Sequence, residues 1–268
     1  MLRLLRRSTA SIGFILRHKH SDRYKNSVNI DLSSPHLWYD GARLIKRKII
    51  CHIGPTNSGK TYAALQRLRE CERGIYCGPL RLLAWEVCEN LRSDNIKCDL
   101  VTGNEQDYIP EGSTHISSTT EMVDLKRTYN VAVIDEAQLI GDMYRGWAWT
   151  QAFLGLKAKE IHLCGSSSML PIINNLITLT SDSIEIINYT RLSPLKPIYN
   201  ALKTYKHIQD GDCVIAFSRK ELFNIKKQIE HTNKNHKCCL IYGGKLPTDT
   251  RATTTTTTTT IATTLNII

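Results

Sequence analysis

Short apolar runs alternate with stretches of helical periodicity from residue 48 onward. The runs predict strands, and the periodic stretches between them predict helices. The run Val-Ala-Val-Ile at 131–134 has no polar position, which is typical of a strand buried on both faces of a sheet. Strands are predicted at 48–53, 74–77, 99–102, 115–118, 131–135 and 160–164, and helices at 60–70, 82–91 and 146–154. This order predicts an α/β fold, a parallel sheet flanked by helices, over a first domain of residues 48–190.

A second unit of the same kind is predicted after Pro194 and Pro197, two prolines that mark a linker. Its predicted elements are a helix at 198–208, a strand at 212–217, a helix at 220–230 and a strand at 237–242. Residues 195–247 would form an incomplete second domain, because a unit of ~50 residues cannot bury its apolar faces alone. Residues 248–268 include eight consecutive threonines and are predicted to be a low-complexity tail. This ending indicates a truncated sequence, with a natural threonine-rich tail as the alternative.

Basic residues are concentrated at the N-terminus. Of the net charge of +10, residues 1–48 contribute +8, so the rest of the chain is nearly neutral. Any binding of nucleic acid must then come from local grooves rather than from a global basic field. Residues 1–25 hold seven basic residues and one acid, Asp22, among apolar and hydroxyl residues, which is typical of a mitochondrial transit peptide. A disordered basic tail is the alternative, and residues 26–47 form a lead-in segment. No apolar run reaches the roughly 18 residues of a membrane span.

Nine cysteines are spread over the chain without a C-x-x-C pair. Several of them lie in apolar runs, which indicates buried free thiols in a reducing compartment rather than a zinc ribbon. The cysteines within these runs are Cys51, Cys77, Cys164 and Cys213.

The strongest chemical signal is a P-loop between the first predicted strand and the first predicted helix. The pattern G-x-x-x-x-G-K-[ST] is matched by Gly54, Pro55, Thr56, Asn57, Ser58, Gly59, Lys60 and Thr61. The glycines allow backbone N–H groups to surround phosphates, and the N-terminus of the following helix favours an anion. Lys60 would neutralise the β and γ phosphates of ATP, and Thr61 would place its hydroxyl on Mg²⁺, with Mn²⁺ as an alternative metal.

Two acids end the apolar strand at 131–135 and suggest hydrolysis. Asp135 would hold Mg²⁺ through its water shell, and Glu136 would polarise the attacking water. Acids after a strand are also common as helix caps, so this pair gains its meaning from the P-loop. Gln138 would sense the γ-phosphate and couple it to a second domain, as in helicases. The predicted catalytic residues are Lys60, Asp135, Glu136 and Gln138.

A nucleoside kinase is the alternative function, because the elements G-P-x-x-S-G-K and D-E-x-Q also occur together in type II thymidine kinases. Those kinases carry a downstream C-x-x-C zinc ribbon, which this sequence lacks, and they have no second α/β unit. A catalytically dead remnant that binds nucleotide and RNA is a further alternative.

Three segments that follow predicted strands are candidates for binding RNA. They lie at the carboxyl edge of the sheet, where the ligand sites of α/β folds gather. They offer small hydroxyl residues, backbone N–H groups and one arginine, which suit contact with a sugar–phosphate backbone. Each is alternatively an ordinary helix cap or loop. The candidate residues are Pro79, Arg81, Thr102, Gly103 and Thr119.

Four large side chains are expected to be structural. Trp149 and Phe153 lie one helical turn apart, which favours core packing over base stacking. His52 and His162 fall within predicted strands and are expected to be buried and neutral rather than metal ligands.

Together with the run from Arg145 to Trp149, these motifs closely resemble the mitochondrial degradosome RNA helicases (Suv-three type), superfamily-two DExH enzymes related to the Ski helicases. The resemblance covers about residues 35–247. It implies an ATP-driven motor with two RecA-like domains that unwinds RNA in the mitochondrial matrix beside an exoribonuclease partner. DNA and RNA–DNA hybrids are alternative substrates. The residues it implies for the ATPase are Lys60, Thr61, Asp135 and Glu136, and those it implies for RNA are Pro79, Arg81, Thr102, Thr119 and Ser218.

The sequence also departs from this family. Only about fifty residues precede the P-loop, where family members carry a sizeable domain. Three serines follow Gly165, where the family usually has an acid, and the later motifs, including an arginine finger, have no counterpart after Lys245. Such a finger contributes on the order of 10³–10⁵ in rate. If the chain is the catalytically dead remnant of the further alternative, we expect it to bind ATP weakly and not to unwind duplexes.

Overall fold

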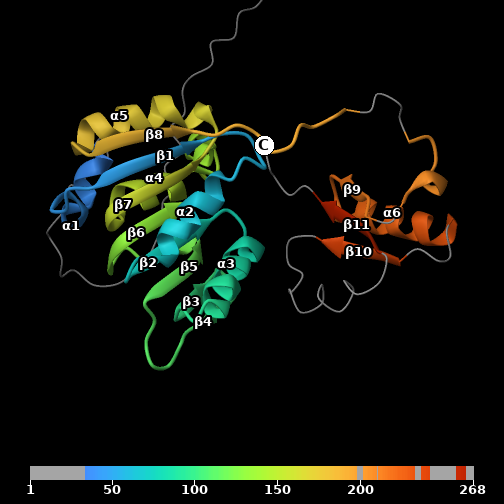
Figure 1. The fold of residues 1–268 in the computed structure, drawn as a ribbon, viewed down its shortest axis with the longest axis horizontal. Helices are drawn as coiled ribbons and strands as arrows, with labels where there is room; N and C mark the ends of the chain where they lie inside the picture. The colour runs from blue at the N-terminus through green and yellow to red at the C-terminus, as the bar shows by residue number, and fades with distance from the viewer. Residues whose placement is uncertain (1–33, 198–201, 210, 233–236, 242–257, 264–268) are drawn as a thin grey trace, which may run out of the picture.

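The larger of two β-sheets contains eight strands (Figure 1). The computed structural model describes residues 34–197, 202–209, 211–232, 237–241 and 258–263. The strand order is β4-β3-β5-β2-β6-β7-β1-β8, and every pairing is parallel except that of β4 with β3. The strands are β1 (Lys48–Ile53), β2 (Gly74–Gly78), β3 (Cys98–Val101), β4 (Gln106–Asp107), β5 (His115–Thr119), β6 (Thr128–Ile134), β7 (Lys157–Gly165) and β8 (Ser183–Asn188). The predicted α/β class is confirmed, and the six predicted strands correspond to β1, β2, β3, β5, β6 and β7.

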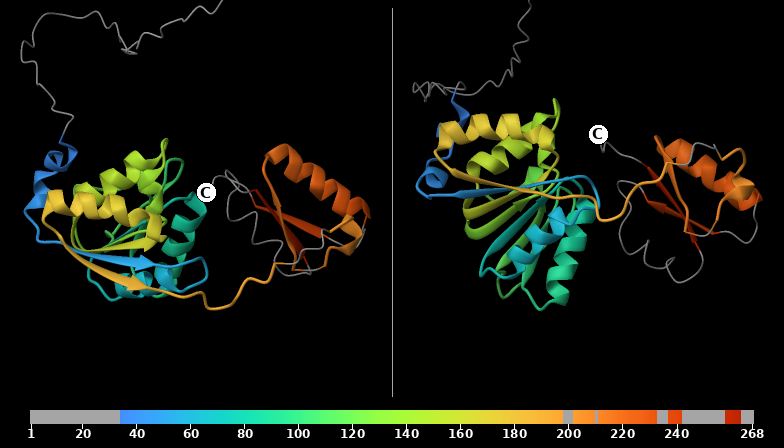
Figure 2. Two further views of the ribbon diagram at one scale, coloured as in Figure 1. Left: turned by 90° about the horizontal axis from the view of Figure 1, so that it is seen from above. Right: turned by 45° about the horizontal axis from the view of Figure 1, so that its top comes forward.

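Helices cover both faces of this sheet (Figure 2). Helices α2 (Lys60–Arg69) and α3 (Arg81–Ser93) lie on one face, and α4 (Gly146–Gly155) and α5 (Leu170–Thr180) lie on the other. Alternate strand residues serve the two faces, as the pleat requires. Tyr76 and Val133 belong to the cluster under α2 and α3, whereas Cys77 packs with α4 on the opposite side. Trp149 and Phe153 of α4 are each 1% exposed, which confirms their predicted place in the core.

Short helices lie around the sheet. Helices η1 (Pro35–Trp38) and α1 (Asp40–Arg43) precede β1. Helices η2 (Thr120–Met122), η3 (Ala137–Gly141) and η4 (Ser167–Met169) follow the ends of β5, β6 and β7. The carboxyl edge of the sheet is therefore built from short, tightly turned segments.

A second sheet has the order β10-β11-β9, with β9 (Cys213–Ala216), β10 (Lys237–Ile241) and β11 (Thr258–Thr263) all parallel. Helix α6 (Arg219–Thr232) packs its buried Leu222, Ile225 and Ile229 in one apolar cluster with residues of β9 and β10. The predicted strands at 212–217 and 237–242 and the helix at 220–230 correspond to β9, β10 and α6. The central strand comes from the segment that the sequence predicts to be a tail. Threonine is β-branched, and β-branched residues favour extended strands, which explains why this threonine-rich segment can form one.

Two expectations are wrong. The helix predicted at 198–208 is absent from residues 202–208, where only a 3-10 helix, η5 (Tyr205–His207), forms and only Ile208 is buried. Cys213 is exposed rather than buried, whereas Cys51, Cys77 and Cys164 are buried free thiols as expected. All nine cysteines are free.

Some predictions concern residues beyond the described ranges. The transit peptide at 1–25 and residues 198–201 lie outside them. None of the helices that the structure describes has the length and apolar character needed to cross a bilayer.

Candidate functional site

The P-loop connects the end of β1 to the start of α2. Its chain reverses through two left-handed residues, Asn57 at a φ of 55° and Gly59 at 83°. Glycine adopts this conformation without the steric cost that other residues pay, so Gly59 fits its position as the residue that precedes α2. Asparagine adopts the left-handed region more readily than most residues with a side chain, which suits Asn57 to this turn.

The side chains of the P-loop turn inward. Lys60 is 7% exposed, and its Nζ donates a hydrogen bond to the carbonyl oxygen of Pro55 at 3.2 Å. The buried Ser58 hydroxyl has no hydrogen-bond partner among the described residues. A buried cation that contacts only a loop carbonyl, beside an unpaired hydroxyl, suits an anionic ligand with several oxygen acceptors. The residues present therefore fit a nucleotide phosphate.

Asp135 lies at the carboxyl end of β6 and is held by three donors. Thr61 Oγ1 donates to its Oδ1 at 3.1 Å, the Tyr76 hydroxyl donates to its Oδ2 at 3.1 Å, and the Glu136 amide donates to Oδ1 at 3.0 Å. Burial raises the pKa of Asp135, and the neighbouring charge of Glu136 raises it further. A hydroxyl and a carboxylate oxygen side by side are the hard ligands that Mg²⁺ prefers. The structure thus brings Thr61 and Asp135 together in a pair that could hold this ion.

Glu136 and Gln138 form the next part of the site. Glu136 has a φ of 48°, a strained conformation for a residue with a side chain. Gln138 Nε2 donates to Glu136 Oε2, and Gln138 Oε1 accepts from the amide of Ser166 at 3.2 Å. Gln138 therefore links the end of β6 to the end of β7, the strand that lies between β6 and β1.

The candidate RNA residues of the first unit lie at the same edge, on the other half of the sheet. They end or follow β2, β3 and β5, with Thr119 the last residue of β5, whereas the P-loop and the acids follow β1 and β6. Arg81 and Gly103 are exposed, Thr119 is 6% exposed, and Pro79 is buried. Thr102 is also buried, and its hydroxyl is already hydrogen-bonded to the backbone of Glu105.

Ser218 belongs to the second unit and follows β9. It is exposed, and its hydroxyl accepts a hydrogen bond from the amide of Glu221 in the first turn of α6 at 3.1 Å. In the described residues it thus acts as a helix cap.

Two residues in the segment after β8 contact the P-loop, although no sequence motif marks them as part of the site. Arg191 donates to the carbonyl and the hydroxyl oxygen of Thr56, both at 3.0 Å. Asn57 Nδ2 donates to Ser193 Oγ at 2.9 Å. The segment from the last strand of the first unit toward the second unit therefore lies directly on the loop. Only its prolines gave a signal in the sequence, and that signal indicated a linker.

A histidine pair beneath the P-loop matches its prediction. His52 Nε2 and His162 Nδ1 are 2.8 Å apart, and the two rings stack with centroids 5.1 Å apart. Burial, with His162 beside it, lowers the pKa of His52 to about 4, and burial also lowers the pKa of His162. Both rings are therefore neutral near pH 7, as expected. His52 Nδ1 lies 2.8 Å from the hydroxyl of Tyr189, the residue that follows β8.

Comparison with known proteins assigns these features to a family. Residues 35–189 match the model of the DEXQ-box helicase domain of Suv3. The chain is 48% identical over 221 residues to the mitochondrial DExH-box ATP-dependent RNA helicase DExH16 of Arabidopsis thaliana, covering 82% of this chain and 38% of that protein. It is 46% identical over 224 residues to the mitochondrial ATP-dependent RNA helicase SUPV3L1 of Gallus gallus, covering 82% and 28%. It is 44% identical over 240 residues to the mitochondrial ATP-dependent RNA helicase SUV3 of Saccharomyces cerevisiae, covering 87% and 32%.

Solved structures show the same fold. A structure of S. cerevisiae Dbp5 bound to Gle1 and IP6 aligns with a TM-score of 0.53 at 13% identity, over 82% of this chain and 65% of that one. Another, of Dbp5 bound to RNA and ADP BeF3, aligns with a TM-score of 0.51 at 12% identity, over 79% and 65%. The RecA-like class expected from the sequence is thereby confirmed. The chain spans about a third of the length of the curated relatives described above.

Proposed function

The chain belongs to the family of Suv3 DEXQ-box helicase domains, and from this premise we propose that it couples ATP hydrolysis to the unwinding of RNA. The observation that carries the proposal is the hydrogen-bonded pair of Thr61 and Asp135, which joins the P-loop to the end of β6 next to the buried Lys60. The curated relatives are named mitochondrial ATP-dependent RNA helicases, which supports this substrate and this energy source.

The P-loop residues would bind the phosphates of ATP. Lys60 would leave the Pro55 carbonyl for the β and γ phosphates, and the backbone N–H groups of Thr56 to Thr61 would surround them. Thr61 and Asp135 would hold Mg²⁺, which when bound neutralises charge that develops on the phosphates. Glu136 would orient and polarise the attacking water, because it directly follows Asp135 and is only partly buried, which leaves it accessible to water. Gln138 would report the state of the γ-phosphate through its link to Ser166.

The loops after β2, β3 and β5 would grip the RNA backbone. Arg81 is exposed there and would pair with phosphate, while exposed main chain at Gly103 would donate hydrogen bonds. Thr119 and the second unit's Ser218 would complete this surface. Contacts with the RNA backbone are compatible with the nearly neutral residues 49–268, because a few local contacts to one strand do not require a large positive field.

We propose that the protein acts in the mitochondrial matrix. There it would take part in RNA turnover together with an exoribonuclease. The relatives' names support a mitochondrial protein, and the transit-like composition of residues 1–25 agrees with it. A helicase supplies single strands, which are the substrate of an exoribonuclease, and this is the reason for the proposed partner.

The test is ATP hydrolysis by the chain with and without single-stranded RNA, compared with Lys60→Ala. We expect RNA to stimulate hydrolysis in the wild type and Lys60→Ala to remove the stimulated rate, because the phosphates lose their only buried P-loop cation in the described residues. Thymidine is added in a parallel reaction. Phosphate transfer to thymidine, or hydrolysis that RNA does not change, would contradict the proposal.

A further inference from the structure

Arg145 joins two of the loops that follow neighbouring strands. It lies in the segment between η3 and α4, and its Nε and Nη2 donate to Glu121 Oε1 at 2.9 and 2.7 Å. Nη2 also donates to the carbonyl oxygen of Pro79 at 2.7 Å. Glu121 follows β5 and Pro79 follows β2, and these two strands are paired. One guanidinium therefore holds together the ends of two strands on the RNA half of the carboxyl edge.

The same guanidinium contacts the nucleotide half through Trp149. The Arg145 Cζ lies 5.2 Å from the centroid of the Trp149 ring, within the range of a cation–π contact. Trp149 is 1% exposed, and its indole N–H donates to the carbonyl oxygen of Asp135 at 2.9 Å. The backbone of the residue proposed to hold the metal is thus one hydrogen bond and one ring contact away from Arg145, which is hydrogen-bonded to the RNA loops.

This junction is held rigidly at its base. Asp142 Oδ1 accepts hydrogen bonds from the amides of Tyr144 and Arg145, at 2.9 and 2.7 Å. The Gly146 amide donates to the carbonyl oxygen of Asp142 at 3.0 Å. Because these hydrogen bonds hold the backbone of Arg145 in its turn, we expect the guanidinium, rather than the loop, to transmit a shift of Trp149.

We propose that Arg145 is the positioning residue that couples the RNA loops to the nucleotide site. A change at the end of β6 moves the Asp135 carbonyl and the Trp149 ring with it, and Arg145 transfers that movement to Pro79 and Glu121. Arg145 itself touches neither nucleotide nor RNA in this scheme. The inference rests on the proposed function, because it requires that both ligands bind at this edge.

The experiment measures the coupling itself. Labelled single-stranded RNA is titrated into the full chain with and without Mg²⁺ and a non-hydrolysable ATP analogue, and the ratio of the two Kd values is the coupling factor. For the wild type we expect a factor of about 5 or more, within the usual range of about 5–150. We expect Arg145→Ala to reduce the factor to below about 2, since it removes all three contacts at once.

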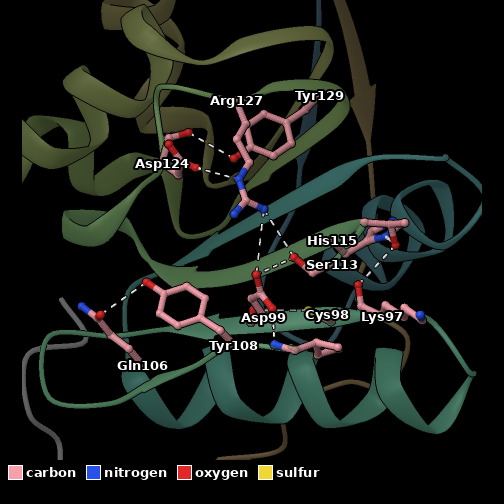
Figure 3. Close-up of polar contacts among 12 residues, drawn as sticks. Lys97, Cys98, Asp99, Gln106, Tyr108, Ser113, His115, Asp124, Arg127 and Tyr129 are labelled. Carbon is pink, nitrogen blue, oxygen red and sulfur yellow. Dashed lines mark hydrogen bonds and ion pairs between the residues drawn. The ribbon is translucent and has the colours of Figure 1, made fainter. Parts of the chain in front are cut away.

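Two further variants separate positioning from a loss of fold. Arg145→Lys retains the charge over Trp149, but an ammonium cannot reproduce the planar fork that serves Glu121 and Pro79 together, so its factor should also fall. Arg127→Ala is the matched control. Arg127 contacts Asp124 at 3.3 Å and Asp99 at 3.9 Å just before β6, at the amino edge of the same sheet (Figure 3).

The outcomes are distinct. The inference holds if Arg145→Ala and Arg145→Lys lose coupling while Arg127→Ala keeps the wild-type factor. It is overturned, with the proposed function intact, if both Arg145 variants keep that factor or if Arg127→Ala loses it equally. A wild-type chain that binds neither RNA nor the ATP analogue would refute the proposed function and this inference with it.

Discussion

Arg47 and Asp182 form an ion pair that is buried where β1 and β8 begin. Arg47 Nε donates to Asp182 Oδ1 at 3.0 Å and Nη2 donates to Oδ2 at 2.5 Å, and the two side chains are 0% and 3% exposed. Arg47 Nη1 also donates to the carbonyl oxygen of Phe153 at 2.7 Å, near the end of α4. The pair fixes the starts of two strands whose other ends meet at the P-loop.

Replacing Arg47 by methionine should be strongly destabilising. The variant keeps the aliphatic bulk but removes the two guanidinium hydrogen bonds to the buried Asp182 carboxylate and the one to the carbonyl oxygen of Phe153 at the end of α4. Breaking a buried ion pair from one side costs about 3–5 kcal/mol, and we expect the lower end because Thr180 still donates to Asp182 at 2.6 Å. Arg47→Met combined with Asp182→Leu should cost less than the sum of the single changes, because the buried carboxylate is removed together with its main partner. Arg43, whose Nη1 lies 3.7 Å from Asp182 Oδ2, would keep its hydrogen bond to the carbonyl oxygen of Leu154.

Urea unfolding followed by tryptophan fluorescence measures these differences. The matched control is Lys48→Met, in the next residue, whose partner Glu185 lies 2.7 Å away with both side chains about half exposed. Water and salt screen such a pair, so its loss should not shift the midpoint resolvably. An Arg47→Met variant as stable as Lys48→Met, or a double variant as unstable as the sum of its parts, would refute the reasoning.

Three other variants test the site. Asp135→Asn should abolish ATP hydrolysis yet increase stability at neutral pH, because burial raises the pKa of Asp135 in the folded chain and its contribution to stability therefore falls as pH rises above the ordinary value of 3.8. In thermal melts from pH 4 to 8, the stability advantage of the variant over the wild type should grow as pH rises, and an advantage that does not change with pH would contradict this. The folded pKa of His52 is about 4 against an ordinary 6.5, so the unfolded chain takes up the proton first; stability should fall by at most about 3 kcal/mol as pH drops from 6.5 to 4, and His52→Gln should flatten that fall, whereas an unchanged slope would contradict it. Gly54→Ala should cost about 1–3 kcal/mol and weaken nucleotide binding, because its Cβ would lie 2.9 Å from the carbonyl oxygen of Tyr189, while Gly103→Ala, with no atom within 4 Å, should melt like the wild type.

Local patterns predicted much of the first unit. The strand at 48–53 and the helix that follows the P-loop agree with β1 and α2, because a buried apolar run and a glycine turn are determined by neighbouring residues. Helix α5 and strand β8, by contrast, were not predicted from the sequence. Five of the six residues of β8 are exposed, because it is an edge strand. Such a strand does not need the continuous apolar run that marks a strand buried on both faces.

The side-chain contacts of the site could not be predicted from the sequence. Tyr76 and Asp135 are 59 residues apart, Pro79 and Arg145 are 66 apart, and Thr56 and Arg191 are 135 apart. Only the strand order brings these pairs together, and a pattern along one segment carries no information about it. The helix predicted at 198–208 failed for a related reason. Over 202–208 only Ile208 is buried, with Tyr205 partly buried against the same apolar cluster, and Leu202 is exposed, so the segment has no continuous helical face on the core.

The proposed function is tested most directly by asking whether the effect of bound nucleotide on RNA affinity depends on Lys60. RNA affinity is measured by fluorescence anisotropy with and without Mg²⁺ and a non-hydrolysable ATP analogue, for the wild type and for Lys60→Ala. We expect the nucleotide to increase the RNA affinity of the wild type by about fivefold or more and to leave the RNA affinity of Lys60→Ala unchanged. An RNA affinity that responds equally to nucleotide in both proteins, or in neither, would contradict it.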